Sequence, residues 1–138
     1  MTPIKECLIN KSTKINPVWL MRQAGRYLPE FKKIRKANPD FIKLCLDHIL
    51  AEEITLQPIK RFGFDAAIIF SDILMIPHGM GQTVEFKKNF GPSLGALELN
   101  KLASVSKKDL TEKLSPVYQL LSNLKNSNDL KTKIYLVS

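Results

Sequence analysis

The segment Asp65-Ala-Ala-Ile-Ile-Phe70 constrains the fold of this chain more than any other part of the sequence. It follows Gly63 and a longer stretch in which apolar residues recur at helical spacing. A short, continuous apolar run of this kind predicts a strand buried on both faces, as the strands of parallel sheets are. A helix followed by such a strand is typical of α/β folds. We therefore expect an α/β chain.

Several helices and strands are expected around this segment. Pro29 suits the first position of a helix, and Ser115 before Pro116 predicts a capping hydroxyl at the start of another. Pro58 is expected to kink or shorten the helix that contains it. The predicted helices are a short one near residues 4–8 and longer ones over 29–37, 41–61 and 115–125; the further predicted strands are 83–86 and 133–137.

The length of 138 residues limits how much of an α/β fold the chain holds. A closed α/β barrel takes about 250 residues. The last predicted strand has no helix after it, which leaves an edge that proteins normally protect. We therefore expect residues 1–138 to be the front part of one larger domain, with a loose lead-in over residues 1–16. By itself, such a piece is expected to be unstable or to aggregate.

Charge and cysteine content narrow the class of protein. The 21 Lys and Arg outnumber the 13 Asp and Glu, and the net charge of +8 favours an anionic partner, whether nucleic acid, membrane surface or small polyanion. Cys7 and Cys45 are far apart with no Cys or His cluster, so neither a disulfide scaffold nor a zinc site is expected. No signal peptide or membrane span is recognisable, and we expect a cytoplasmic protein without a membrane partner.

Arg22 and Arg26 form the first candidate binding feature. They stand four residues apart after the apolar run Pro17–Met21, with Gln23, Ala24 and Gly25 between them. Guanidinium groups keep their charge at neutral pH and bind carboxylates through two parallel hydrogen bonds. Such a pair suits a ligand with several carboxylates. Spacing alone nevertheless favours two solvated arginines.

Asp72 is the second candidate. It ends the apolar run over residues 66–70, where a carboxylate is costly unless it is paired, hydrogen-bonded or catalytic. The carboxyl end of a parallel strand is also where α/β folds place their reactive groups. Position alone leaves a catalytic role and a loop-capping role equally open.

Other polar residues carry weaker signals. His78 could act as a base or a ligand, but a single loop histidine is more often structural, and His48 has no evident role. The basic cluster of residues 32, 33, 35 and 36 is interpreted as a solvated helix face. Gly79-Met-Gly81 lacks the third glycine of a dinucleotide loop, so a nicotinamide or flavin cofactor is not indicated.

Two blocks of sequence resemble the uroporphyrinogen decarboxylase family: PVWLMRQAGRYLPEF at 17–31 and LQPIKRFGFDAAIIFSDILMIPHGMG at 56–81. The resemblance is strong over residues 16–95 and weaker over 100–130. It implies a (β/α)8 TIM barrel, of which this chain would be the N-terminal part. It also implies a homodimer that works without metal or organic cofactor and converts the four acetate arms of uroporphyrinogen III to methyls, giving coproporphyrinogen III.

The resemblance also implies roles for particular residues. Arg22 and Arg26 would hold substrate carboxylates, and Asp72 would accept hydrogen bonds from pyrrole N–H groups. Arg22 is the proton donor suggested by family analogy, although a guanidinium is a reluctant acid. The implied catalytic residues are Asp72 and Arg22, and the implied substrate-binding residues are Arg22, Gln23, Ala24, Gly25, Arg26 and Asp72.

Two other functions stay open beside this one. A corrinoid methyltransferase shares the fold, but its relatives generally lack the Arg22–Arg26 motif and carry zinc ligands near the C-terminus. A small basic module that binds RNA or other anions would use aromatic residues such as Phe31 and Phe62, yet these fall at helical or core spacing. The family's later tyrosine, serine or threonine, and histidine contacts would lie beyond Ser138, so activity is expected only in the complete chain.

Overall fold

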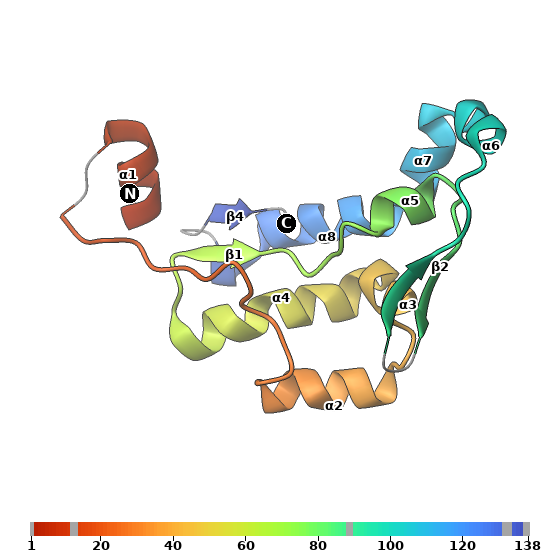
Figure 1. The fold of residues 1–138 in the computed structure, drawn as a ribbon. Helices are drawn as coiled ribbons and strands as arrows, with labels where there is room; N and C mark the ends of the chain where they lie inside the picture. Colours follow the sequence, from red (N-terminus) through yellow and green to blue (C-terminus); the bar gives the residue numbers. More distant parts are fainter. Residues whose placement is uncertain (1, 12–13, 88–89, 131–133, 137–138) are drawn as a thin grey trace.

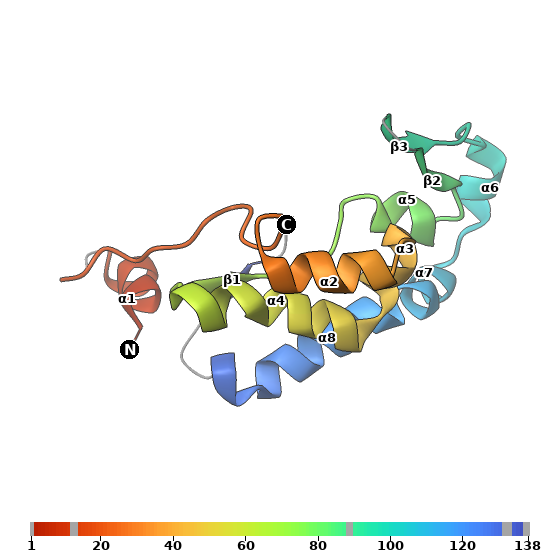
Figure 2. The ribbon, with the colours of Figure 1, turned by 90° about the horizontal axis from the view of Figure 1, so that it is seen from below.

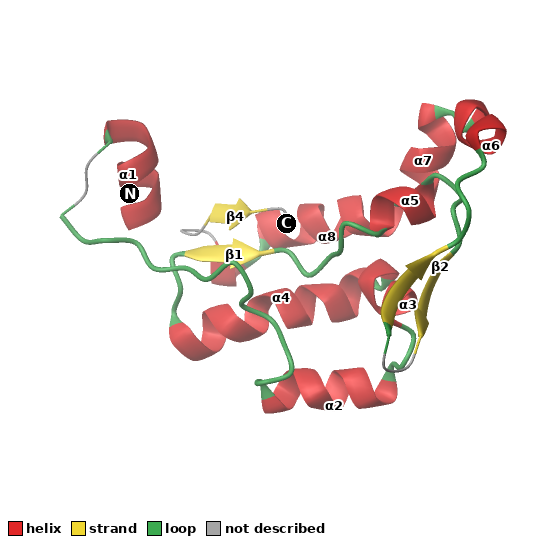
Figure 3. Ribbon diagram, in the orientation of Figure 1, coloured by secondary structure: helices red, strands yellow, loops and turns green. Residues whose placement is uncertain are grey.

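The computed structural model of the protein describes residues 2–11, 14–87, 90–130 and 134–136. The chain contains both helices and strands, and two of the strands are parallel, in agreement with the predicted α/β class (Figure 3). The elements are α1 (Pro3–Asn10), α2 (Pro29–Ala37), α3 (Phe41–Leu46), α4 (His48–Phe62), β1 (Ala66–Ile68), α5 (Met75–Gly79), β2 (Val84–Lys87), β3 (Gly91–Leu94), α6 (Leu99–Ser104), α7 (Lys107–Lys113), α8 (Ser115–Asn126), the 3-10 turn η1 (Asn128–Leu130) and β4 (Ile134–Leu136).

Strands β1 and β4 form a parallel pair at the centre of the molecule (Figure 1). Ala66 lies opposite Ile134 and Ile68 opposite Leu136. The chain between the two strands includes helix α8. Parallel strands need a long crossover connection, which usually contains a helix, and this connection meets that requirement. The strand predicted over 65–70 is therefore confirmed as β1, which is shorter than expected. The strand predicted over 133–137 is confirmed over residues 134–136, and residues 133 and 137 lie outside the described residues.

Helix α4 packs against β1, α8 and α2, and it lies between β1 and α2 (Figure 1 and Figure 2). A first buried cluster joins α4 and β1 to Leu120 and Leu124 of α8, and a second joins Leu28 and Phe31 to Ile54 of α4. A third contains Cys45 and residues of α5 and α7. Phe70, at the carboxyl end of β1, packs against all three clusters, so the position of this strand end is set by most of the core.

The single helix predicted over residues 41–61 is wrong, because two helices, α3 and α4, occupy this region. Asp47 separates them: its carboxylate accepts hydrogen bonds from the backbone N of Ile49 and Leu50, which caps the start of α4. Within α4, Ile54 is buried, whereas Ile49 is 66% exposed.

The sequence predicted that Pro58 would kink or shorten α4, and the structure shows that it does not shorten the helix. The helix continues to Phe62 and stops at Gly63, whose φ of 67° is readily adopted only by glycine. Residues 54–59 are buried almost throughout. Tertiary packing of this turn therefore offsets the hydrogen bond that proline cannot donate.

The region between β1 and α8 holds more structure than the sequence suggested. The predicted strand over 83–86 is confirmed as β2, which pairs with β3 in an antiparallel hairpin. Helices α5, α6 and α7 were not predicted. Ser106 and Asp109 form a capping box at the start of α7, which is a signal that could have found that helix. Because α7 runs into α8, Leu114 and not Ser115 precedes α8, and the predicted Ser115 cap is wrong.

The N-terminal lead-in contains helix α1, as predicted near residues 4–8, capped by Thr2. It is followed by a segment that runs beside β1. Val18 and Asp65 are joined there twice: the backbone N of Val18 donates to Asp65 Oδ2 at 2.8 Å, and the backbone N of Asp65 donates to the carbonyl of Val18 at 2.9 Å. These bonds bring the arginine-containing segment to the sheet.

None of the helices in the described ranges has the length and apolar character needed to cross a membrane.

Candidate functional site

A cavity of about 640 Å³ lies at the carboxyl end of β1. Its walls come from the segment after Met21, from α2 and α3, from the end of β1 and from the tip of the β2–β3 hairpin. The lining residues are Met21, Arg22, Gln23, Ala24, Gly25, Arg26, Phe31, Arg35, Phe41, Ile68, Ile69, Phe70, Ser71, Asp72 and Phe86. All six residues that the sequence proposed for the site are in this set.

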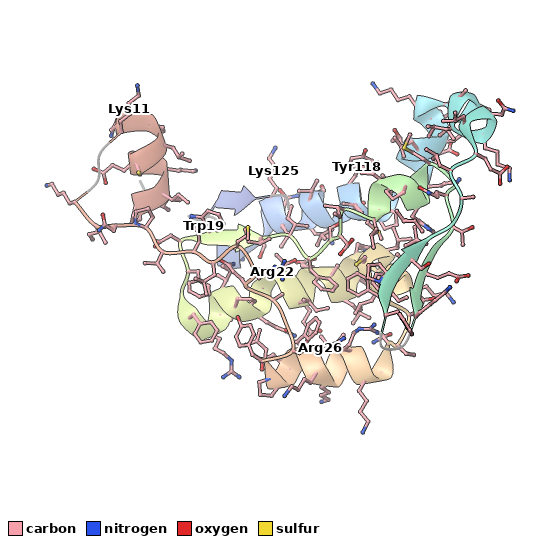
Figure 4. All side chains as sticks on the ribbon, in the orientation of Figure 1. Lys11, Trp19, Arg22, Arg26, Tyr118 and Lys125 are labelled. Atoms are coloured by element: carbon pink, nitrogen blue, oxygen red, sulfur yellow. The ribbon has the colours of Figure 1, made fainter. Side chains whose placement is uncertain are left out.

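Arg22 and Arg26 enter the cavity from the segment that descends from β1 to α2 (Figure 4). Both side chains are exposed at the cavity mouth. Arg26 lies in a turn that is closed by the backbone N of Leu28, which donates to the carbonyl of Gly25 at 3.0 Å. The structure thus brings the arginine pair and Asp72 to one cavity, although residues 22 and 72 are far apart in the sequence.

Arg35 is a third guanidinium in the cavity wall, and the sequence reasoning assigned it to a solvated face. It is half-buried, its Nη1 donates to the carbonyl of Asn38 at 2.6 Å, and its Cζ lies 5.6 Å from the ring centre of Phe41. Phe31, four residues earlier on α2, is buried and lines the same cavity. Residues four apart lie on the same face of a helix, so the spacing between Phe31 and Arg35 could have indicated that Arg35 faces the cavity.

Asp72 is half-buried in the loop after β1. Its Oδ1 accepts a hydrogen bond of 2.9 Å from the backbone N of Leu74, and its carbonyl accepts one of 3.0 Å from Met75. Within the described part of the chain, Oδ2 has no hydrogen-bond partner. The loop-capping role is therefore observed, and it leaves one carboxylate oxygen available to a ligand.

Gln23 is placed differently from its neighbours, since only 1% of it is exposed. Its Oε1 accepts from the backbone N of Leu20 at 3.0 Å, and its Nε2 donates to the carbonyl of Ala66 at 3.0 Å. Ala24 and Gly25 are half-buried and line the cavity without a polar side chain.

Cys45 lies in α3 and is fully buried. Its burial, together with the smaller effect of the negative charge of Asp72, raises the pKa of its thiol to about 12. The site therefore contributes no reactive thiolate at neutral pH.

The remaining sequence candidates do not line this cavity. His78 lies in α5, His48 is the first residue of α4, and the side chains of Lys32, Lys33 and Lys36 are exposed on α2. Among the residues that the structure describes, no group of three or more His, Cys, Asp or Glu is arranged to hold a metal ion.

A second cavity of about 220 Å³ lies between α5 and α6. Its lining is mostly apolar, and its charged residues, Glu98 and Lys101, are already paired at 2.8 Å. It therefore lacks the combination of guanidinium groups and an available carboxylate that distinguishes the larger cavity.

Fold and site together define an α/β protein with a cavity lined by three arginines and one aspartate at the carboxyl end of a parallel strand. The family model for uroporphyrinogen decarboxylase (URO-D) matches residues 2–136, and the chain belongs to this family.

Three relatives, each named uroporphyrinogen decarboxylase, illustrate the similarity. The protein of Chelativorans sp. (strain BNC1) is 43% identical over 129 residues, which are 94% of this chain and 38% of the relative. That of Rickettsia felis is 48% identical over 125 residues, 91% of this chain and 36% of the relative. That of Rickettsia massiliae is 50% identical over 109 residues, 79% of this chain and 32% of the relative. The chain thus spans about a third of the length of these relatives, and their shared name is neither that of a methyltransferase nor that of an RNA-binding module.

Proposed function

We propose that this chain supplies part of the active site of a uroporphyrinogen decarboxylase, a carboxy-lyase that removes the four acetate carboxyls of uroporphyrinogen III in porphyrin and haem biosynthesis. The observation that carries the proposal is the cavity at the end of β1, whose lining includes three arginines, Arg22, Arg26 and Arg35, together with the carboxylate-bearing Asp72. The family membership of the chain and the shared name of its relatives support the same reaction.

The arginines are assigned to the substrate carboxylates. Arg22 and Arg26 bind propionate and acetate groups at the cavity mouth, and Arg35 adds a third positive charge deeper in the wall. Phe31, Phe41 and Phe86 supply apolar surface for the rings of the macrocycle. This mixture of charged rim and aromatic wall suits a molecule with an apolar centre and anionic arms.

Asp72 is assigned to the reaction itself. Protonation of the pyrrole carbon next to an acetate arm makes the ring an electron sink. The bond between the CH₂ and the carboxyl group then breaks and carbon dioxide leaves, and the electron pair of that bond forms an exocyclic C=C bond that neutralises the ring. A second proton adds to the exocyclic carbon to give the methyl group, and the ring carbon loses the first proton, which restores the aromatic pyrrole. The carboxylate of Asp72 accepts hydrogen bonds from pyrrole N–H groups and stabilises the positive charge of the protonated ring. Arg22 is the candidate proton donor, and no metal or organic cofactor takes part in this scheme.

The wider architecture belongs to the same proposal. Strands β1 and β4 with their helices correspond to the N-terminal part of a (β/α)8 barrel, and the rest of the site comes from later parts of the complete enzyme. The homodimer and the cytoplasmic location implied by the resemblance stay predictions.

The test is a fusion of this chain to the part of the Rickettsia felis relative that follows the matched region. The fusion is incubated with uroporphyrinogen III without oxygen, and the products are oxidised and separated by their number of carboxyl groups. We expect stepwise loss of acetate carboxyls down to coproporphyrinogen. Asp72→Asn is expected to lower kcat by about 100-fold or more, because an amide stabilises the cationic ring far less than a carboxylate does.

Glu53→Gln is the matched control, since Glu53 is an exposed carboxylate outside the cavity. It should keep kcat within about twofold, and circular dichroism should show the same helix content in both variants. A folded fusion that binds uroporphyrinogen III without converting it, or an Asp72→Asn variant with near-normal turnover, would contradict the proposal.

A further inference from the structure

Gln23 stands between the arginines of the site, yet its side chain is buried and hydrogen-bonded within the protein. Both ends of its amide are engaged, with Leu20 on one side and with Ala66 at the start of β1 on the other, at 3.0 Å each. Because the residue is 99% buried, water does not compete for these two bonds. One side chain thus connects the arginine segment to the central strand.

The backbone of Gln23 is also held. Its carbonyl accepts a hydrogen bond from the hydroxyl of Tyr27, one residue beyond Arg26. The two hydrogen bonds between Val18 and Asp65, one of them to the Asp65 carboxylate, fix the same segment upstream. The arginines therefore lie on a loop that is attached to β1 before Arg22 and tied to itself around Arg26.

A direct role of the Gln23 amide in carboxylate binding is incompatible with this arrangement. A substrate carboxylate needs a donor, and the donor of this amide, Nε2, is already bonded to Ala66. Turning the side chain into the cavity would leave the carbonyl of Ala66 and the N–H of Leu20 without these partners. Each such loss typically costs about 1–3 kcal/mol.

We propose that Gln23 is a positioning residue, which fastens the Arg22–Arg26 segment to β1 so that both guanidinium groups meet the substrate from a fixed backbone. The inference rests on the proposed function for the identity of the substrate. The geometry itself does not depend on it. Holding two long, flexible cations in place lowers the conformational cost of binding a polycarboxylate.

Amide hydrogen exchange in the 138-residue chain provides the first test. Gln23→Met keeps the length of the side chain and removes both hydrogen bonds. We expect exchange of the amides over residues 20–26 to increase by about tenfold or more, while the amides of α4 keep their protection. Gln119→Met, on the exposed face of α8, is the matched control and should leave residues 20–26 unchanged. Unchanged exchange over 20–26 in Gln23→Met overturns the proposal, and so does an equal increase throughout α4.

A second variant separates positioning from loss of packing. In Gln23→Glu, an ionised carboxylate faces the carbonyl of Ala66, whereas the protonated acid regains a donor. Protection of residues 20–26, taken relative to the unmodified chain at the same pH, should therefore return as the pH is lowered from 8 to 5. A pH-independent loss of protection contradicts the assigned hydrogen bond.

Binding of uroporphyrinogen III by the same chain tests whether Gln23 acts through the arginines. Gln23→Met should weaken binding about tenfold when Arg22 is present and at most twofold in an Arg22→Ala background, because Gln23 affects binding by positioning the arginine. Equal effects in both backgrounds overturn the proposal. If the unmodified chain does not bind uroporphyrinogen III, the proposed substrate fails, and the exchange results still decide the role of Gln23.

Discussion

The hydroxyl of Thr55 accepts a hydrogen bond of 2.9 Å from the backbone N of Phe70 and donates one of 2.7 Å to the carbonyl of Ala51. It therefore joins helix α4 to the carboxyl end of β1, two residues before Asp72. Thr55 is buried, and Phe70 packs edge to face with Phe31 and Phe41 at 5.8 and 5.9 Å between ring centres. One hydroxyl and one aromatic ring thus fix the strand end that carries the candidate catalytic carboxylate.

Replacing Thr55 by valine should lower the free energy of unfolding by about 1–3 kcal/mol, because the N–H of Phe70 loses its acceptor while the side-chain shape is kept. Urea unfolding measures the effect. Thr55→Ser restores the hydroxyl and should recover most of the loss. Thr111→Val is the matched control: its hydroxyl also donates four residues back, to Lys107 at 2.8 Å, but it is exposed on α7. Equal losses for Thr55→Val and Thr111→Val would exclude the assigned bridge.

Gln57 is a position where substitution should stabilise the chain. It is only 7% exposed, and among the described residues neither its Nε2 nor its Oε1 has a hydrogen-bond partner. A buried amide without partners costs about 1–3 kcal/mol. Gln57→Met keeps the shape, and we expect the free energy of unfolding to rise by about 1 kcal/mol or more. Gln119→Met on the exposed face of α8 should change it by less than about 0.5 kcal/mol. A clear loss of stability in Gln57→Met would show that the amide is paired in solution.

Cys45 should resist alkylation. With a pKa of about 12, its thiol is ionised to roughly one part in ten thousand at pH 8 in the folded chain. Iodoacetamide followed by peptide mass spectrometry should therefore label the half-buried Cys7 first, by about 100-fold or more. Because the folded pKa lies above the ordinary value of 9.0, this group favours the folded state below pH 9, and that contribution decreases as the pH rises towards 12. Cys45→Ala removes this part of the pH dependence, and labelling of Cys45 as fast as Cys7 would refute its burial.

The basic face of α2 should speed substrate capture without taking part in the reaction. Lys32 and Lys36 line a shallow hollow together with Arg26 and Arg35, which also line the site cavity. Replacing both lysines by glutamate should slow association of uroporphyrinogen III several-fold at low salt, and the difference should shrink as salt screens the charges. Stopped-flow measurements of the association rate provide the readout.

The control for this charge reversal is the double change Lys107→Glu and Lys108→Glu on α7, which alters the net charge by the same amount. Both lysines are exposed, and neither lines the site cavity. An equal reduction in rate for both pairs would show that net charge alone, and not the face of α2, drives capture.

Local patterns predicted many elements and missed others for identifiable reasons. Pro29 and the spacing after it gave the bounds of α2 correctly, and the apolar run after Asp65 gave β1. The break at Asp47 was missed because continuous helical spacing concealed a capping aspartate. The sequence did not predict that α4 continues through Pro58. Helix propensity reflects the hydrogen bond that proline cannot donate, but it does not include the stabilisation from burial of the surrounding turn.

The candidate site, too, was predicted from the sequence only in part. Residue types and spacing singled out Arg22, Arg26 and Asp72, whereas Arg35 was misjudged because a helical charge cluster does not reveal which member faces inwards. Gln23 was expected to bind substrate together with its neighbours. Its buried amide favours a different role, which the exchange experiment tests.

The sequence by itself determined the α/β class, the parallel relation of the two central strands and the chemistry available to the site, since these follow from apolar periodicity and residue type. Only the tertiary structure decided which side chains meet. The convergence of Arg22, Arg35 and Asp72 on one cavity and the attachment of Gln23 to Ala66 join segments about 40 residues apart. Such contacts depend on how the core clusters around Phe70 pack, and packing is a property of the whole chain that no local pattern contains.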